Sequence, residues 1–366
     1  MSPKQPQPPS TKQPFIITPP LLNSANPWAT TEADLQALYD CPYTGAVTIR
    51  TSLWQVFTQH PFTHQYTFFS SSLGHATANI NVDLPEGRGD VLAGETSSLN
   101  TLGYSPIAFE EYVAMLREEA KTKHSESDNG LKTKPFIVSV TGSAEEVGRC
   151  CEHLLEDASS LDLDSDLDLD LDLMMEINLS CPNIPDKPPP AYDGASLTEY
   201  ITAVGKAKSN VPKTYSRGLH VGIKTPPYTY QGQFQILIDA LERSTSLEGG
   251  CPISFITATN TLGSCLVLNG NDDPALGSVN GSGIGGLAGD ALHPIALGNV
   301  RTVRGMLDAS EYADVRDIKI IGIGGVSDAA AYRRMMKVGA EAVGVGTALG
   351  REGVAVFEKI SKGLEA

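Results

Sequence analysis

The segment Asn178-Leu179-Ser180-Cys181-Pro182-Asn183 contains the residues of this chain that are best suited to chemistry. It follows an apolar run beginning at Met174 that predicts a buried strand. Pro182 lacks an N–H and holds the preceding residue in extended geometry, so the chain must leave the sheet there. We therefore expect the thiol of Cys181 at the carboxyl end of a strand, where α/β barrels keep their chemistry. A lone cysteine is more often a small core residue, but two flanking asparagines, which offer donors and acceptors to a planar polar ligand, favour a reactive thiol.

Two glycine-rich turns follow neighbouring apolar runs near the C-terminus: Gly322-Ile323-Gly324-Gly325 and Gly344-Val345-Gly346-Thr347. In barrel enzymes, the loops after the last two strands commonly form a phosphate site from backbone N–H groups. Glycine lets the backbone approach a phosphate closely, and Thr347 adds a hydroxyl. Tight turns without a ligand are the alternative, but turns after two adjacent strands favour a phosphate-bearing ligand.

Polar residues also end the two apolar runs expected before these turns. Lys224 lies at the end of one, in Gly222-Ile223-Lys224-Thr225-Pro226-Pro227-Tyr228, and Asn260 ends the next. A lysine in this place is costly unless it meets an anion, which a phosphate or a negatively charged reduced flavin would supply. A third glycine cluster, residues 281–289, is interpreted first as a flexible loop. Beside the two glycine turns, it could also form a further wall of the ligand site with its backbone.

Eight short apolar runs alternate with amphipathic helical patterns. The expected strands are residues 15–22, 46–51, 136–140, 174–179, 221–224, 254–259, 318–323 and 342–345. The expected helices are residues 32–39, 109–121, 145–156, 197–208, 234–242, 294–307, 328–338 and 354–363. Because each strand precedes a helix and the strands are almost continuously apolar, the pattern predicts an α/β fold, a parallel (β/α)8 TIM barrel. An open doubly wound sheet would need Gly-x-Gly-x-x-Gly after its first strand, and the sequence there is Asn23-Ser24-Ala25-Asn26-Pro27.

Two segments do not fit the barrel repeat. Residues 52–103 are long and rich in aromatic, His, Gly and Ser residues, and we expect a small antiparallel β lid at the top face. Residues 158–173 alternate Leu and Asp, and their self-repulsion predicts a solvated, poorly ordered insertion without a function. We expect residues 1–14 to form a disordered tail and residues 15–366 a single domain.

Composition limits the function classes. The 366 residues carry a formal net charge of −16, which argues against nucleic acid or an anionic membrane as a partner. No stretch approaches the ~20 continuous apolar residues of a membrane span, and the N-terminus has no apolar signal-peptide core. Six cysteines without a Cys-x-x-Cys pair predict free thiols in a reducing cytoplasm, with no metal site.

On these motifs the chain resembles the dihydroorotate dehydrogenases, and within them the cytoplasmic class 1A enzymes that use fumarate. The strongest match is residues 178–188, supported by residues 224–228 and 294–301. The resemblance runs from about Phe15 to the last helix. It implies FMN as cofactor, oxidation of dihydroorotate to orotate in pyrimidine biosynthesis, fumarate as electron acceptor and a homodimer. The membrane-bound class uses a serine base and an N-terminal anchor, neither of which is expected here.

The resemblance also assigns site residues. Cys181 would be the base that takes a proton from one substrate carbon while hydride passes from the neighbouring carbon to flavin N5, and a free thiol titrates near ~8.5, close enough to neutrality for this role. Lys224, the second catalytic residue, would stabilise the reduced flavin. The pyrimidine would be lined by Arg50, Asn100, Leu102, Gly103, Tyr104, Asn178, Asn183, Asn260 and Thr261. The flavin would be held by Ser24, Ala25, Arg50, Thr51, Asn178, Lys224, Thr259, Gly289, Gly324, Gly325, Gly346 and Thr347.

Three departures from the family pattern leave alternatives open. Arg50 replaces the usual lysine, and a planar guanidinium is not equivalent to an ammonium. It could bind the substrate carboxylate bidentately or indicate another substrate. Tyr104 stands where a smaller apolar residue is usual, and the turn at residues 24–27 lacks the usual glycine. The alternatives are a diverged FMN-dependent oxidoreductase acting on another small cyclic or enoate substrate, and a flavin-binding protein without turnover, against which the intact Cys181 and Lys224 argue.

Overall fold

The computed structural model describes residues 15–76, 81–82, 91–126, 134–160, 173–180, 189–211 and 218–365. Its centre is a sheet of eight parallel strands in the order β1-β13-β12-β9-β8-β7-β6-β2. Their bounds are β1 Leu21–Asn23, β2 Val47–Thr48, β6 Phe136–Val140, β7 Leu173–Asn178, β8 His220–Thr225, β9 Phe255–Ala258, β12 Lys319–Ile323 and β13 Ala342–Val345. Each strand lies within one of the eight predicted runs or overlaps it, so the predicted TIM barrel is confirmed.

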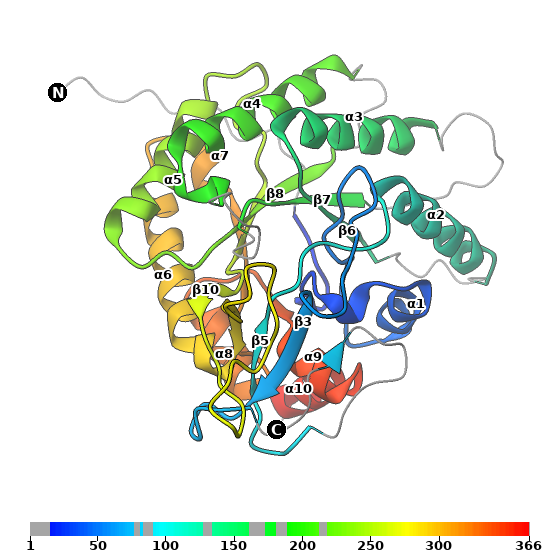
Figure 1. Ribbon diagram of the computed structural model, residues 1–366. Helices are drawn as coiled ribbons and strands as arrows, with labels where there is room; N and C mark the ends of the chain where they lie inside the picture. Colours follow the sequence, from blue (N-terminus) through cyan, green and yellow to red (C-terminus); the bar gives the residue numbers. More distant parts are fainter. Residues whose placement is uncertain are drawn as a thin grey trace.

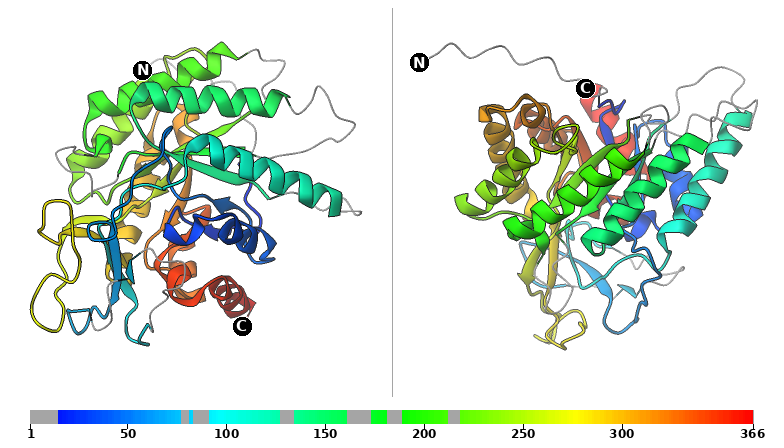
Figure 2. Two further views of the ribbon diagram at one scale, coloured as in Figure 1. Left: turned by 45° about the vertical axis from the view of Figure 1, so that its right-hand side comes forward. Right: turned by 90° about the horizontal axis from the view of Figure 1, so that it is seen from above.

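Helices surround these strands (Figures 1 and 2). They are α1 Glu32–Asp40, α2 Phe109–Glu126, α3 Ala144–Ser160, α4 Gly194–Asn210, α5 Gln231–Ser244, α6 His293–Ala309, α7 Ala313–Arg316, α8 Ala329–Lys337, α9 Thr347–Glu352 and α10 Ala355–Glu365. All eight expected helices are present, with ends that differ by a few residues. Local chemistry sets several starts: Thr31 and Asp34 form a capping box on α1, and Asp328 accepts a hydrogen bond from the N–H of Ala331 at the start of α8.

The first strand is shorter than predicted. Residues 15–20 are not a strand, because Pro19 and Pro20 have no N–H to donate to a neighbouring strand. The segment instead closes the bottom of the barrel. The ring of Phe15 lies 5.4 Å from that of Phe255 and 5.7 Å from that of His220, measured between centroids. Ile17 packs with the side chains that fill the lower barrel interior, among them Met174, Phe255 and Ile321.

The barrel closes at a seam between β1 and β2. A single bridge pairs Leu22 with Ala46, and a buried side chain replaces the remaining backbone ladder. The Asn23 amide donates to the Thr48 carbonyl at 2.6 Å, and its oxygen accepts from the Thr48 N–H at 2.9 Å. Asn23 is fully buried, so it satisfies both backbone groups where water does not reach.

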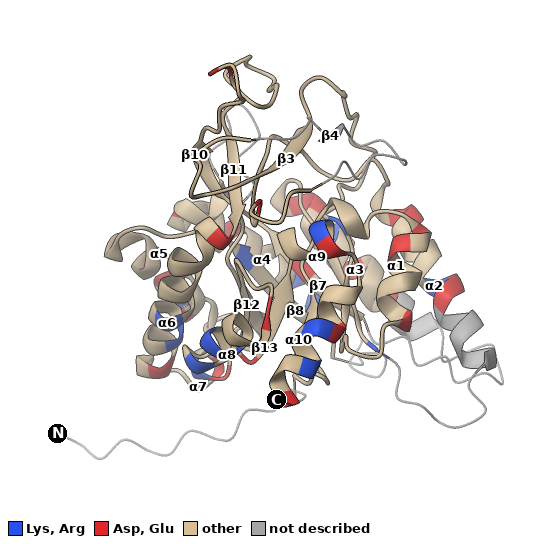
Figure 3. Ribbon diagram, turned by 90° about the horizontal axis from the view of Figure 1, so that it is seen from below, with Lys and Arg blue, Asp and Glu red and all other residues tan. Residues whose placement is uncertain are grey.

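The lid is a second, antiparallel sheet in the order β10-β11-β5-β3-β4. It comprises β3 Gln65–Phe69, β4 Asn81–Val82, β5 Ser97–Asn100, β10 Leu262–Cys265 and β11 Gly285–Gly289. Figure 3 shows the lid strands together at one end of the barrel. The predicted antiparallel insertion is confirmed for residues 52–103. However, two of its strands come from the connection after β9.

The glycine cluster at 281–289 is therefore not simply a loop, because its second half is β11. These glycines allow β11 to lie against its neighbours. A Cβ on Gly285 would lie 2.2 Å from the Asn100 carbonyl oxygen, and one on Gly286 would lie 2.2 Å from the Thr261 hydroxyl. A larger residue at either position would push β11 away from β5 or from the end of β9.

Two predicted segments fall largely outside the described residues. The tail at 1–14 lies entirely outside them. Of the Leu/Asp insertion at 158–173, residues 158–160 belong to α3 and residue 173 belongs to β7, and residues 161–172 are not described. In the described part of the chain, no helix combines the length and apolar character required to cross a bilayer.

The seam yields a stability prediction. Replacing Asn23 with Ala would leave the buried N–H and C=O of Thr48 without partners, so we expect a loss of roughly 2–4 kcal/mol in the free energy of unfolding. Urea unfolding followed by circular dichroism measures the change. The matched control is Asn271→Ala, which removes an exposed asparagine from a lid loop. A loss of less than about 0.5 kcal/mol for Asn23→Ala, the usual range for surface substitutions, would contradict the assignment.

Candidate active site

One pocket opens at the carboxyl ends of the barrel strands, beneath the lid. Its empty space, counted out to the open mouth, is ≈ 1000 Å³. Every predicted site residue that the structure describes lies on its wall. These are Ser24, Ala25, Arg50, Thr51, Asn100, Leu102, Gly103, Tyr104, Asn178, Lys224, Thr259, Asn260, Thr261, Gly289, Gly324, Gly325, Gly346 and Thr347. Cys181 and Asn183 lie outside the described residues.

The wall also contains residues that the sequence analysis did not identify. They are Asn26, Pro27, Trp28, Tyr66, Ser98, Ala288, Leu292 and Ile323. Trp28 packs edge-to-face on Tyr66 with ring centroids 5.2 Å apart and stacks on Phe68 at 5.7 Å. These contacts join the loop after β1 to the lid. The aromatic pattern of Gln65-Tyr66-Thr67-Phe68-Phe69 was the available signal, but the pattern alone does not say which aromatic faces a ligand.

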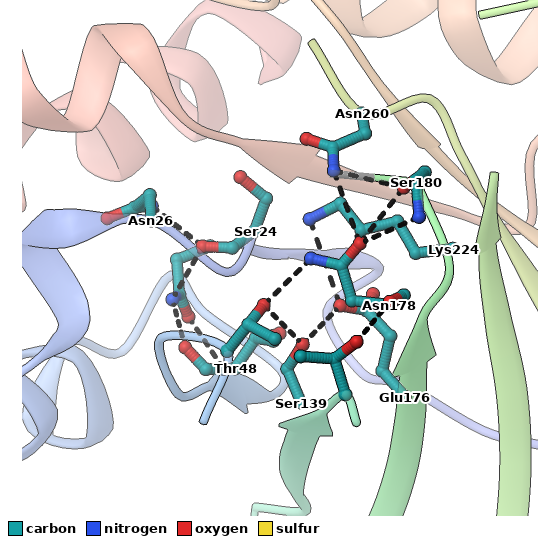
Figure 4. A network of polar contacts seen from close by, with 12 residues as sticks. Ser24, Asn26, Thr48, Ser139, Glu176, Asn178, Ser180, Lys224 and Asn260 are labelled. Atoms are coloured by element: carbon teal, nitrogen blue, oxygen red, sulfur yellow. Dashed lines mark hydrogen bonds and ion pairs between the residues drawn. The ribbon is translucent and has the colours of Figure 1, made fainter. Parts of the chain in front are cut away.

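Two asparagine amides form the polar part of the floor (Figure 4). The amide nitrogen of Asn178 donates to the Thr51 hydroxyl at 3.0 Å. Its oxygen accepts from the Ser180 N–H at 3.2 Å, the Ser180 hydroxyl at 3.0 Å and the Asn260 amide at 3.3 Å. The Asn260 amide also donates to the Ser180 hydroxyl at 3.0 Å. Each amide therefore has one orientation that satisfies its neighbours, which is how a protein presents a defined donor and acceptor pattern.

Lys224 meets an anion within the protein itself. Its ammonium lies 3.8 Å from a carboxylate oxygen of Glu176, and both side chains are 3% exposed. The register of the barrel explains the contact, because Asn178 is paired with Lys224 and Glu176 lies two residues earlier on the same face of β7. The sequence analysis missed Glu176. A carboxylate within an apolar strand is costly unless it is paired, so the argument applied to Lys224 would also have found Glu176.

Arg50 reaches the wall from the end of β2 and is 4% exposed. Its backbone N–H donates to the Ala29 carbonyl at 2.9 Å, and its guanidinium contacts the Thr30 hydroxyl at 3.5 Å. Its positive charge is also felt in the neighbouring loop. Burial lowers the pKa of His64 first, and the charges of His60 and Arg50 lower it further. The pocket thus carries two buried cations, Arg50 just beyond β2 and Lys224 on β8.

Tyr104 lies where the loop 52–64 covers the pocket. The ring of Phe57 packs edge-to-face on Tyr104 with centroids 5.7 Å apart. It also occupies the space beside Gly103, where a Cβ would lie 2.2 Å from the Phe57 ring. Only glycine fits at position 103 with this loop in place. The loop therefore shapes the wall formed by Gly103 and Tyr104.

The two glycine turns predicted to hold a phosphate line the same pocket. Gly325 has φ +65°, and a Cβ there would lie 2.6 Å from the His293 Cβ. Arg334 donates to Nε2 of His293, so Nδ1 carries the proton and donates to the Gly324 carbonyl at 2.7 Å. On the other turn, the Thr347 hydroxyl is 2.9 Å from that of Ser98. Both turns are therefore held in place by side chains from other parts of the chain, His293 and Ser98.

These residues fit a flat polar ring that carries a phosphate. Thr259 lines the pocket, and its buried hydroxyl has no hydrogen-bond partner in the described part of the chain. A buried hydroxyl without a partner is costly, and the polar edge of a bound ring would satisfy it. Backbone N–H groups at the glycine turns and the cations Arg50 and Lys224 complete a donor set suited to an anionic planar ligand.

Comparisons with known proteins agree with this geometry. The model of the dihydroorotate dehydrogenase family matches residues 77–366. A putative dihydroorotate dehydrogenase A (fumarate) of Streptococcus pyogenes serotype M1 is 31% identical over 269 residues, covering 73% of this chain and 72% of the relative. Proteins of the same description from Streptococcus equi subsp. equi and Streptococcus agalactiae serotype Ia are 31% and 30% identical, with the same coverage. The chain therefore belongs to the dihydroorotate dehydrogenase family.

Proposed function

We propose that this protein is an FMN-dependent oxidoreductase that oxidises dihydroorotate to orotate with fumarate as electron acceptor. The observation that carries the proposal is the hydrogen-bonded pair Asn178 and Asn260, which forms one floor with Lys224 beneath a lid. A pyrimidine-dione ring alternates donors and acceptors along its edge, and oriented amides match such an edge. The fumarate acceptor rests on the names of relatives such as the one that is 31% identical to this chain over 269 residues. The homodimer stays a prediction.

FMN would be held by the two glycine turns at its phosphate and by Ser24, Ala25, Thr259 and Lys224 around its ring. Bound FMN would supply the hydride acceptor and pass the electrons on. The protein's own part is to bind and orient. Gly324, Gly325 and Gly346 leave room for a close approach of the backbone, and the ammonium of Lys224 would stabilise the negative charge of the reduced ring. The lid would exclude water from the ring.

Cys181 is the proposed base. Of the five cysteines in the described ranges, none lies on the pocket wall. Burial raises the pKa of Cys150 and Cys151 on α3 to about 12, which keeps them as protonated core thiols. Cys181 directly follows Ser180, whose hydroxyl and N–H both bind Asn178 at the pocket floor. A thiol is a suitable base near neutral pH when it is positioned at the substrate carbon.

Arg50 and Tyr104 favour a second candidate, a diverged FMN-dependent oxidoreductase with another small cyclic or enoate substrate. Both side chains line the pocket and both depart from the usual family residues. Anaerobic mixing separates the two candidates. Dihydroorotate bleaches the yellow protein if the main proposal holds, and fumarate restores the colour. Failure of dihydroorotate to bleach the flavin, with bleaching by another reduced ring or enoate, would support the second candidate.

The base assignment gives a mutational prediction. Cys181→Ala removes the proton acceptor, so we expect flavin reduction by dihydroorotate to slow by roughly 10²–10⁴-fold. FMN binding should persist. Cys265→Ala is the matched control, because Cys265 is a half-buried lid thiol away from the pocket wall. Stopped-flow absorbance under anaerobic conditions measures the rate. Cys181→Ala protein that is reduced at the wild-type rate would exclude Cys181 as the base.

Arg50 gives a second prediction. A guanidinium can bind the substrate carboxylate through two parallel hydrogen bonds, whereas an ammonium keeps only the charge. We expect Arg50→Lys to raise the KM for dihydroorotate about tenfold, equivalent to the loss of one charged hydrogen bond. Steady-state kinetics and orotate titration measure this change, with Arg149→Lys as a control on an arginine that stacks over Trp54 outside the pocket. An unchanged or lower KM would show that Arg50 does not bind the carboxylate.

A further inference from the structure

Glu176 lies below the pocket rather than on its wall. Along β7, Met175 and Ile177 pack outward against the helices, whereas Met174 belongs to the cluster inside the barrel. Alternate residues of a strand face opposite sides, so Glu176 and Asn178 also point inward. The Glu176 side chain is 3% exposed and is absent from the pocket lining. It therefore acts on a ligand only through the residues above it.

The contacts of Glu176 determine the direction of a chain of hydrogen bonds (Figure 4). An ionised carboxylate can only accept, so the Ser139 hydroxyl donates to Glu176, at 2.8 Å. The single proton of Ser139 is then used, and the Thr51 hydroxyl must donate to Ser139 across 2.9 Å. Thr51 in turn accepts from the Asn178 amide at 3.0 Å. The direction of each hydrogen bond in this chain therefore follows from the direction of the one before it.

The last member of this chain lines the pocket. Because the Asn178 nitrogen is directed at Thr51, its oxygen is directed at Ser180 and Asn260. Rotating the amide by half a turn would place NH₂ against the N–H of Ser180 and would lose three accepted hydrogen bonds. The carboxylate thus supports, through two hydroxyls, the same orientation of Asn178 that the Ser180 N–H requires.

The same carboxylate oxygen holds the ammonium of Lys224 at 3.8 Å. Both charges are buried, where an ion pair is screened much less than at the surface and an unpaired charge is costly. The pair keeps the floor close to electrically neutral before an anion binds. Loss of the negative member would leave a positive charge facing the pocket.

We infer that Glu176 is a positioning residue: it orients the Asn178 amide through Ser139 and Thr51, and it offsets the charge of Lys224 at the pocket floor. The two effects are separable. Ser139 transmits only the first, whereas the carboxylate charge is responsible for the second. The orotate measurement below rests on the proposed function, but the measurement on bound FMN requires only that the protein binds FMN.

Glu176→Gln tests both effects in the FMN-loaded protein. A glutamine amide can donate as well as accept, so Ser139 is no longer forced to donate to residue 176. The Asn178 orientation then loses the support of this hydrogen-bond chain and keeps only that of Ser180 and Asn260. We expect orotate to bind about tenfold more weakly, from the loss of one to two net hydrogen bonds. The uncompensated ammonium of Lys224 should favour the reduced, anionic flavin, so the two-electron midpoint potential should rise by about 30 mV, equivalent to a tenfold change in the reduction equilibrium.

Two further variants distinguish positioning from general damage. Ser139→Ala interrupts the hydrogen-bond chain but leaves the carboxylate and the ammonium in place. It should weaken orotate binding about tenfold with an unchanged midpoint potential. Glu242→Gln is the matched control, because Glu242 on α5 also accepts from a serine hydroxyl, that of Ser310 at 2.6 Å, outside the pocket. It should change neither quantity. Thermal melting and FMN content show that each variant folds.

The outcomes are distinguishable. Glu176→Gln protein with wild-type potential and wild-type orotate affinity would overturn the inference while leaving the proposed function intact. Wild-type protein that binds FMN but neither binds orotate nor is reduced by dihydroorotate would overturn the proposed function, and the midpoint potential of Glu176→Gln would still decide the role of the charge. If Glu176→Gln protein fails to fold, Ser139→Ala tests the inference instead. An unchanged orotate affinity in that variant would contradict the hydrogen-bond chain from Glu176 to Asn178.

Discussion

The ion pair between Glu176 and Lys224 inside the barrel is the interaction on which the site depends. Two opposite charges lie 3.8 Å apart in an interior where each alone would be strongly disfavoured. Their positions are set by strand register, which pairs Ser139 with Glu176 and Asn178 with Lys224. A slip of one residue between β6, β7 and β8 would turn these side chains away from the interior. The polar floor therefore requires the barrel to be in one register.

Barrel and lid make different contributions to the pocket. The barrel strands and the residues just after them supply the charged groups and the amides of Asn178 and Asn260. The lid supplies close walls, and glycine makes these possible. Gly103 accommodates the ring of Phe57, and Gly286 accommodates the hydroxyl of Thr261. A pocket built in this way has rigid polar groups at its floor and a cover that is shaped by packing.

Family membership and the detailed structure answer different questions. Membership rests on the match of residues 77–366 to the family and agrees with the observed barrel. The structure adds that Arg50 is buried on the same pocket wall as Tyr104 and that its charge acts on His64 in the loop 52–64. A guanidinium recognises planar anions through a fixed fork of donors. The detailed structure therefore shows a buried guanidinium on the pocket wall, which family membership by itself does not describe.

The sequence by itself determined the barrel, because each strand and helix has a local pattern of apolar residues that shows which of its faces is buried. The glycine turns and the polar strand ends could also be predicted from it, and every predicted site residue among them that the structure describes lines one pocket. The tertiary structure alone decided which elements pair. The pairing of β11 with β5 joins residues far apart in the chain, and no local pattern in 281–289 indicates it. The partner of Glu176, the place of Trp28 beside Tyr66 and the seam closed by Asn23 depend on register and closure in the same way. A local pattern predicts that a side chain is buried. Which side chain it contacts depends on how the strands pair when the sheet closes.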